Sequence, residues 1–193
     1  MKVFGTGWQR TGTTSLSKAL KALGIPTLDF PSYLLADLDH EVIRRYDGFT
    51  DNPIPLLYRE LDRRHPGSKF VHTERDEEEW LASVQWLFEV GSLKFEWAKR
   101  PIIGEMHQRL YGTTTFEREL FLERYRRHNR EVAEHFAGRP RDLLVLDVIG
   151  GEGYEKLCPF LGIDPPATPF PHWNKRENPV KVRLRKLWRR LGS

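Results

Sequence analysis

A loop rich in glycine and hydroxyl residues constrains the fold of this chain more than any other segment. Residues 5–16 have the sequence Gly-Thr-Gly-Trp-Gln-Arg-Thr-Gly-Thr-Thr-Ser-Leu and follow the short apolar pair Val3 and Phe4. Glycines allow backbone N–H groups to approach an anion, and the N-terminus of a following helix adds positive potential. The segment therefore predicts a strand, a phosphate-binding loop and a helix in succession, which is a typical start of an α/β domain.

The loop departs from the Walker pattern of ATP- and GTP-using enzymes at one informative position. Gly7 and Gly12 occupy the two glycine positions and Thr14 the hydroxyl position, but Thr13 stands where that pattern has lysine. The lysine acts on the β- and γ-phosphates of a nucleoside triphosphate. The cation of this loop is instead Arg10, three residues earlier than Thr13. We expect the loop to bind a nucleotide phosphate without using ATP in the usual way.

Hydrophobic periodicity predicts alternating strands and helices along the chain. Strands are expected at residues 2–5, 27–29, 69–73 and 143–147, the last of them apolar and buried, with a strand or turn at 48–51. Helices are expected at residues 14–23, 37–46, 54–64, 76–90, 116–136 and 152–160, and short helices at 91–112 cover the site. Such alternation predicts an α/β fold, a single P-loop-type domain with a central parallel sheet flanked by helices. Ligands of these sheets bind at the carboxyl ends of strands, where Asp51 and Arg75 are expected.

Length and composition set further bounds. A chain of 193 residues is long enough for one domain with a sizeable core, and Cys158 is its single cysteine, which suits a reducing compartment. The sequence has no signal-peptide pattern, no apolar stretch of the roughly 20 residues that a membrane span requires, and no cluster with the spacing of zinc ligands. We therefore expect a cytoplasmic protein that holds no metal.

The net charge of +4 is unevenly distributed. Residues 175–193 contain eight Lys or Arg and one acid, so they carry +7, and the other 174 residues carry −3. This division predicts a domain at residues 1–174 and a basic amphipathic C-terminal tail at 175–193. The first interpretation of residues 180–191 is a terminal helix docked on the domain; weak contact with an anionic membrane surface, or Lys175 and Arg176 reaching a nucleotide, are the alternatives. The acidic body disfavours a specific nucleic-acid partner, and the oligomeric state is left open.

Three segments, in order, resemble the sulfotransferases that use 3′-phosphoadenosine 5′-phosphosulfate (PAPS). Arg10-Thr11-Gly12-Thr13-Thr14-Ser15 resembles their 5′-phosphosulfate loop. Thr73-Glu74-Arg75-Asp76, with Ser83 eight residues after Arg75, resembles their 3′-phosphate segment. Residues 169–174 resemble the C-terminal part of a compact, largely microbial branch, and residues 153–162 add to that likeness. The resemblance spans residues 2–174.

The resemblance implies transfer of a sulfuryl group from PAPS to a hydroxyl or amine of an unidentified small-molecule acceptor, without a metal. It implies that Arg10 stabilises charge on the bridging oxygen of the donor, and that Arg75 and Ser83 bind the 3′-phosphate. The implied donor-binding residues are Arg10, Thr11, Gly12, Thr13, Thr14, Ser15, Arg75 and Ser83. Glu77 stands where relatives often have proline, a departure that should alter the turn but not the phosphate contact.

The general base implied by the resemblance is Asp51. In the similar branch an aspartate of an Asp-x-Pro segment lies near the acceptor, and here that segment is Asp51-Asn52-Pro53. A carboxylate works well as a base when burial raises its pKa. The alternative is that Asp51 is only a turn residue, because Asp and Asn before Pro favour turns. Asp29, at the end of the second strand, and His128, on the long helix, are rival bases.

Two other functions are kept open. One is a nucleotide or small-molecule kinase with a degenerate Walker A loop, for which residues 143–147 resemble a Walker B strand. The other is a non-catalytic binder of membranes or nucleic acid that uses the basic tail. An apolar acceptor pocket is expected to draw on the following aromatic residues: Phe49, Tyr58, Trp86, Phe95, Trp97 and Tyr111.

Overall fold

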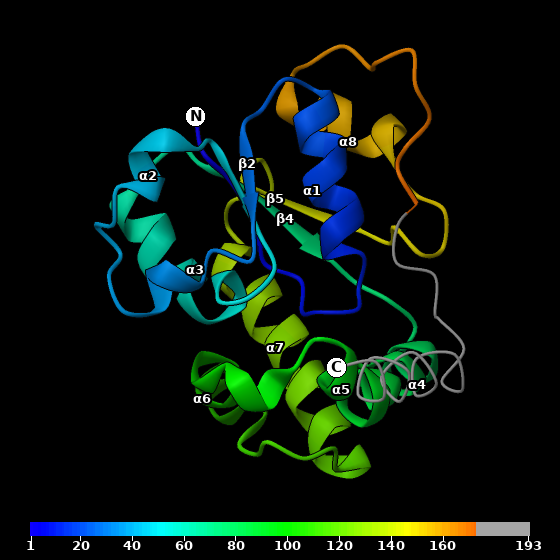
Figure 1. The fold of residues 1–193 in the computed structure, drawn as a ribbon. Coiled ribbons are helices and arrows are strands. Elements are labelled where there is room, and N and C mark those ends of the chain that lie inside the picture. The colour runs from blue at the N-terminus through cyan, green and yellow to red at the C-terminus, as the bar shows by residue number, and fades with distance from the viewer. Residues whose placement is uncertain (173–193) are drawn as a thin grey trace, which may run out of the picture.

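The computed structural model describes residues 1–172 and shows a parallel sheet with helices on both faces and a further layer of helices below it (Figure 1). The strands of this part of the chain form one sheet in the order β2-β3-β1-β4-β5, and every neighbouring pair is parallel. Their bounds are β1 Val3–Gly5, β2 Thr27–Asp29, β3 Gly48–Thr50, β4 Lys69–Thr73 and β5 Leu143–Leu146. The predicted α/β class with a central parallel sheet is confirmed.

The helices lie between successive strands, with one long insertion between β4 and β5, and α8 follows β5. The α-helices are α1 Thr13–Ala22, α2 Val42–Arg45, α3 Ile54–Arg64, α4 Glu77–Trp86, α5 Ser92–Lys94, α6 Pro101–Tyr111, α7 Arg118–Phe136 and α8 Tyr154–Leu161. Two 3₁₀ turns, η1 Ser32–Leu35 and η3 Trp97–Lys99, and a π-helical turn, η2 Leu87–Gly91, complete the set.

The two faces of the sheet are covered by different helices because strand side chains alternate between faces. On β1, Val3 points to the face covered by α1 and α8, and Phe4 to the face covered by α2, α3 and α7. Phe4 lies 5.6 Å from Phe49 and 5.4 Å from Phe70, ring centre to ring centre, and these rings form the centre of the second core.

A third core joins the helical layer to the phosphate loop. Trp8, in that loop, packs among buried residues of α4, α6 and α7. Its ring centre is 4.9 Å from that of Tyr111, and the rings of Trp80 and Tyr125 stack at 4.2 Å. The loop is therefore held between the sheet and the helices of residues 77–136.

Three predicted elements differ from those observed. The helix expected at residues 37–46 is only Val42–Arg45, because the Asp37 carboxylate accepts the Asp39 N–H at 2.8 Å, a local bond that competes with helix formation. The helix expected at 76–90 changes to the π-helical turn after Trp86. The strand expected to be buried at 143–147 is an edge strand, and Val145 is 43% exposed.

The predicted domain boundary at residue 174 and the basic tail at 175–193 lie outside the described residues. Within residues 1–172, no helix combines the length and the apolar character needed to cross a membrane. The same residues bring together no group of three or more His, Cys, Asp or Glu side chains that could hold a metal ion.

Candidate active site

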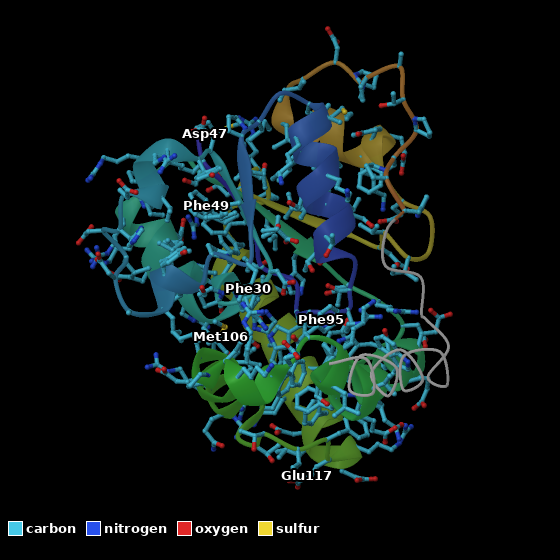
Figure 2. The ribbon with its side chains drawn as sticks, in the orientation of Figure 1. Phe30, Asp47, Phe49, Phe95, Met106 and Glu117 are labelled. Carbon is cyan, nitrogen blue, oxygen red and sulfur yellow. The ribbon has the colours of Figure 1, made fainter. Side chains whose placement is uncertain are left out.

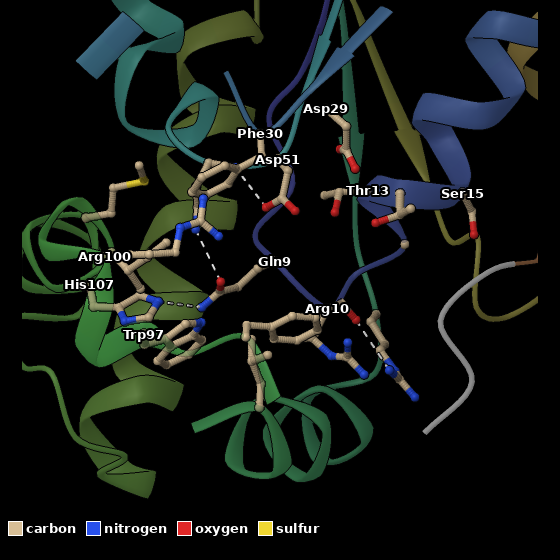
Figure 3. Close-up of a pocket in the computed structure, with 18 of the residues that line it drawn as sticks. Gln9, Arg10, Thr13, Ser15, Asp29, Phe30, Asp51, Trp97, Arg100 and His107 are labelled. Atoms are coloured by element: carbon tan, nitrogen blue, oxygen red, sulfur yellow. Dashed lines mark hydrogen bonds between the residues drawn. The ribbon is translucent and has the colours of Figure 1, made fainter. Parts of the chain in front are cut away.

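A cavity of about 360 Å³ lies where the carboxyl ends of the strands meet the helical layer (Figure 3). Its walls come from the phosphate loop and α1, from the residues after β2, β3 and β4, and from residues 87–107 of the helical layer. Figure 2 shows Phe30, Phe95 and Met106 gathered at this junction, with Phe49 higher in the sheet. This position is where ligands of parallel α/β sheets usually bind.

The loop is fixed against β4 by close backbone packing. A Cβ added to Gly7 would lie 2.0 Å from Thr73 Oγ1, and the Thr11 and Thr73 hydroxyls are 2.6 Å apart. Gly12 has a φ of 109°, in the left-handed region that glycine tolerates, and it precedes the first turn of α1. The first N–H groups of a helix have no partner within the helix and point out of its N-terminus. The loop therefore presents the positive end of α1 to the cavity.

Arg10 joins the loop to the second predicted phosphate-binding segment. Its Nε–H donates to Ser83 Oγ at 2.9 Å, and its backbone carbonyl accepts a bond from Arg75 Nη1 at 3.3 Å. The Arg10 guanidinium also lies 5.5 Å from the ring centre of Trp86. The fold thus brings together three residues that the sequence separates by up to 73 positions, and two guanidinium groups lie beside the loop.

Arg75 is held by contacts on both sides. Its side chain is only 14% exposed and pairs with Glu79 at 3.0 Å. The Tyr125 hydroxyl accepts the Arg75 N–H and donates to the Arg75 carbonyl, each at 3.0 Å. Asp76 caps α4 by accepting the Glu79 N–H. The charged start of α4 therefore has a capping role, and it also orients Arg75 toward the loop.

Two carboxyl groups, Asp29 at the end of β2 and Asp51 directly after β3, lie beside the start of α1 in the wall of the cavity. Burial, with a further contribution from the Asp29 carboxylate, raises the pKa of Asp51 to about 7. The Asn52 N–H, the Thr13 hydroxyl and the Arg10 charge act in the opposite direction. Burial also raises the pKa of Asp29, against hydrogen bonds from Thr50 and Thr14. At neutral pH the pair can hold a proton and release it, as a general base must.

Unusual backbone geometry concentrates around the cavity. Within residues 1–172, four non-glycine residues have a left-handed φ, and Arg10 at 75°, Asp51 at 67° and Phe30 at 58° all line the cavity. Non-glycine residues in this region cost free energy and persist where the surrounding structure imposes them. The strain places two ionisable groups and one aromatic ring in the wall of the same cavity.

Most of the predicted donor-binding residues line the cavity, and two lie behind it. Thr11 is buried, and both its N–H and its hydroxyl bond to the Trp8 carbonyl; Ser83 is buried beneath Arg10. The predicted residues in the cavity wall are Arg10, Gly12, Thr13, Thr14, Ser15, Asp51 and Arg75. The rival base Asp29 also lines it, whereas His128 does not: its Nε2 lies 2.8 Å from the Thr6 carbonyl, and its ring stacks on Trp8.

Of the six aromatic residues predicted to line an acceptor pocket, Phe95 and Trp97 line the cavity. Phe49 and Tyr58 belong to the sheet core, Tyr111 packs in the helical core, and Trp86 lies beside Arg10 instead of lining the cavity. The remaining apolar wall of the cavity comes from residues that were not predicted to line a pocket: Phe30, Leu87, Ile103, Met106 and Ile149.

Sequence reasoning also missed a polar network centred on Gln9. Its amide nitrogen donates to the Tyr111 hydroxyl at 2.9 Å and lies 3.4 Å from His107 Nε2, and its amide oxygen accepts from Asn52 at 3.2 Å. Burial lowers the pKa of His107 to about 4, so this imidazole is neutral at pH 7. The network connects the loop, the Asp51 turn and α6. Its one sequence signal is the position of Gln9 within the loop.

A family model described as a sulfotransferase domain matches residues 2–41 and 27–178. A protein named Ava biosynthesis cluster protein M, from Aspergillus versicolor, is 26% identical to this chain over 236 aligned positions, which cover 98% of this chain and 87% of that protein.

Proposed function

Because this chain belongs to the sulfotransferase domain family, we propose that its cavity binds PAPS and that it transfers the sulfuryl group to a hydroxyl or amine of a small-molecule acceptor. Sulfotransferase activity in general follows from the family. The donor is inferred from one observation above others, the contact of Arg10 with both Ser83 and Arg75 beside the N-terminus of α1. A nucleotide with phosphate groups at two positions matches the two neighbouring guanidinium groups of Arg10 and Arg75.

The residues present fit such a donor. Backbone N–H groups at the start of α1 and the hydroxyls of Thr13, Thr14 and Ser15 would hold the 5′-phosphate. Arg75 would hold the 3′-phosphate, because a guanidinium offers two parallel charge-assisted hydrogen bonds to a phosphate. Its present partner Glu79 is 59% exposed, so water can solvate that carboxylate when Arg75 turns to the nucleotide.

Arg10 and Asp51 would serve opposite ends of the transfer. PAPS supplies the sulfuryl group: a bond from sulfur to the acceptor oxygen forms as the bond from sulfur to the phosphate oxygen breaks. Asp51 takes the proton of the acceptor hydroxyl, and its raised pKa makes it a stronger base than an exposed aspartate. The Arg10 charge stabilises the negative charge left on the phosphate oxygen.

The experiment that tests the donor compares two nucleotides by calorimetry in the absence of Mg²⁺. Adenosine 3′,5′-bisphosphate, the product left by PAPS, should bind at least tenfold more tightly than 5′-AMP, because charge-assisted bonds to one further phosphate contribute roughly 1.5–3 kcal/mol. Arg75→Ala should remove this preference while leaving 5′-AMP affinity nearly unchanged. Arg109→Ala, on the outer side of α6 and paired with Glu105, is the matched control.

Equal affinity of the unmodified protein for the two nucleotides would contradict the proposal. Turnover of ATP with Mg²⁺ would instead support the kinase alternative, which lacks the Walker lysine at Thr13.

A further inference from the structure

The cavity has two halves with different chemistry. One half, formed by the loop, Arg10 and Arg75, is polar and suits phosphates. The other half is largely apolar: Phe30, Trp97 and the His107 ring lie there in Figure 3, and Ile103 and Met106 of α6 also line the cavity. One charged side chain, Arg100, lies in this apolar half. In Figure 3, Asp51 lies between Arg100 on one side and Ser15 on the other.

Arg100 is positioned by its surroundings. Its backbone N–H donates to the Trp97 carbonyl at 2.8 Å, and its carbonyl accepts the Ile103 N–H at 2.9 Å at the start of α6. Its guanidinium lies 5.3 Å from the ring centre of Phe30. A guanidinium over an aromatic face is held in orientation by a cation–π contact and keeps its N–H groups available at the edge.

The charge of Arg100 has no acidic partner within residues 1–172. The neighbouring Lys99 pairs with Glu96 at 3.1 Å, and Arg75, in the other half of the cavity, pairs with Glu79. No carboxylate of the described residues lies within salt-bridge distance of Arg100. A cation at the start of α6 is also disfavoured by the helix dipole, so this charge does not stabilise the helix.

The Arg100 charge is also not needed to balance the negative charge of Asp29 and Asp51. Arg10 is the cation that acts on Asp51, and Lys21 and Lys18 act on Asp29. What remains is an oriented guanidinium, with an unused bidentate edge, in an apolar wall on the side of Asp51 away from the loop.

We propose that the acceptor carries an anionic group, a carboxylate in the simplest case, on an apolar body, and that Arg100 binds this group. This inference rests on the proposed function, because it assigns the loop half of the cavity to the donor. The apolar body would pack against Phe30, Trp97 and Met106, and the hydroxyl would point back to Asp51. Arg100 would then determine specificity without taking part in the chemical step.

The test uses the full chain saturated with adenosine 3′,5′-bisphosphate, which forms a complex that cannot react. Three hydroxyaryl acids, 4-hydroxybenzoate, 4-hydroxyphenylacetate and 3-(4-hydroxyphenyl)propanoate, are each compared with their methyl esters by calorimetry. At least one acid should bind about tenfold more tightly than its ester, the effect of one charge-assisted contact. Arg100→Gln should remove the preference, and Arg100→Lys should keep part of it. Arg109→Gln, on α6 but outside this cavity, should leave it unchanged.

The proposal is overturned if no acid binds more tightly than its ester, or if Arg100→Gln keeps the preference. Thermal unfolding of each variant, with and without nucleotide, shows whether the fold and the donor site are intact. A protein that fails to bind the bisphosphate contradicts the donor assignment alone. The comparison of acids with esters is then made on the free protein and still decides the role of Arg100.

Discussion

Replacing Asp51 by asparagine should stabilise the protein at high pH and impair its activity. Asn keeps the shape of the side chain, and its amide oxygen can still accept the Asn52 N–H that now bonds to Asp51 at 2.8 Å. It removes a carboxyl whose pKa is raised by burial, and by the Asp29 carboxylate, from 3.8 to about 7. The substitution therefore removes the free-energy cost of burying this charge and leaves the shape of the side chain almost unchanged.

The magnitude follows from proton linkage. Between pH 4 and pH 7 the unfolded chain releases the Asp51 proton while the folded protein retains it. The contribution to stability is thus fully present below pH 4 and is lost as the pH rises through 7. One pKa unit corresponds to 1.36 kcal/mol, so the loss is at most about 4 kcal/mol. This is an upper limit, because the side chain lines an open cavity.

The assay is urea unfolding of wild type and Asp51→Asn from pH 4 to pH 8, with the exposed Asp164→Asn as control. Groups distant from Asp51 titrate alike in both proteins, so the difference in the free energy of unfolding reports Asp51 together with its electrostatic effect on Asp29. Relative to wild type, the free energy of unfolding of Asp51→Asn should rise by up to about 4 kcal/mol between pH 4 and pH 8. The control should show no such change. A difference that does not vary with pH would refute the reasoning.

The same variant should lose activity while keeping the donor. Its kcat should fall by roughly a hundredfold or more, because an amide cannot accept the proton of the acceptor. Its affinity for adenosine 3′,5′-bisphosphate should be almost unchanged. If Asp51→Asn keeps full turnover on an unactivated alcohol, Asp51 is not the base. Asp29 and His107, the neutral imidazole of the same cavity, are then the candidates.

Two further substitutions test the loop. Arg10→Ala should lower kcat by about 10²–10³-fold, the usual loss when one hydrogen-bond donor to a developing charge is removed. Arg44→Ala, at an exposed position, is its control, and equal kcat values in the two variants would contradict this role of Arg10. Gly7→Ala should lower the free energy of unfolding by roughly 1–3 kcal/mol or more, because the new Cβ would lie 2.0 Å from Thr73 Oγ1 and 2.3 Å from its carbonyl. Gly104→Ala, with no neighbouring atom within 4 Å of its Cβ in α6, should be neutral or stabilising in the same urea titration.

Local sequence patterns were sufficient for the parts of the molecule that depend on neighbouring residues. The strand, loop and helix at residues 3–22 form because apolar pattern, glycines and hydroxyls follow one another directly. Where a local competitor was overlooked, the prediction was wrong: the Asp37 side chain bonds to the backbone at Asp39 and shortens the helix expected at 37–46.

The sequence by itself determined the α/β class, the strand–loop–helix unit at residues 3–22 and the spacing of Arg75 and Ser83, because periodicity and short motifs are properties of adjacent residues. Tertiary structure decided which side chains share a cavity. Arg100 directly precedes α6 and His107 lies within it, about 90 residues after the loop, and only packing brings them to Phe30 and Gln9. It also decided the charge state of Asp51, because desolvation depends on every residue that covers the carboxyl, and no pattern along the chain records that environment.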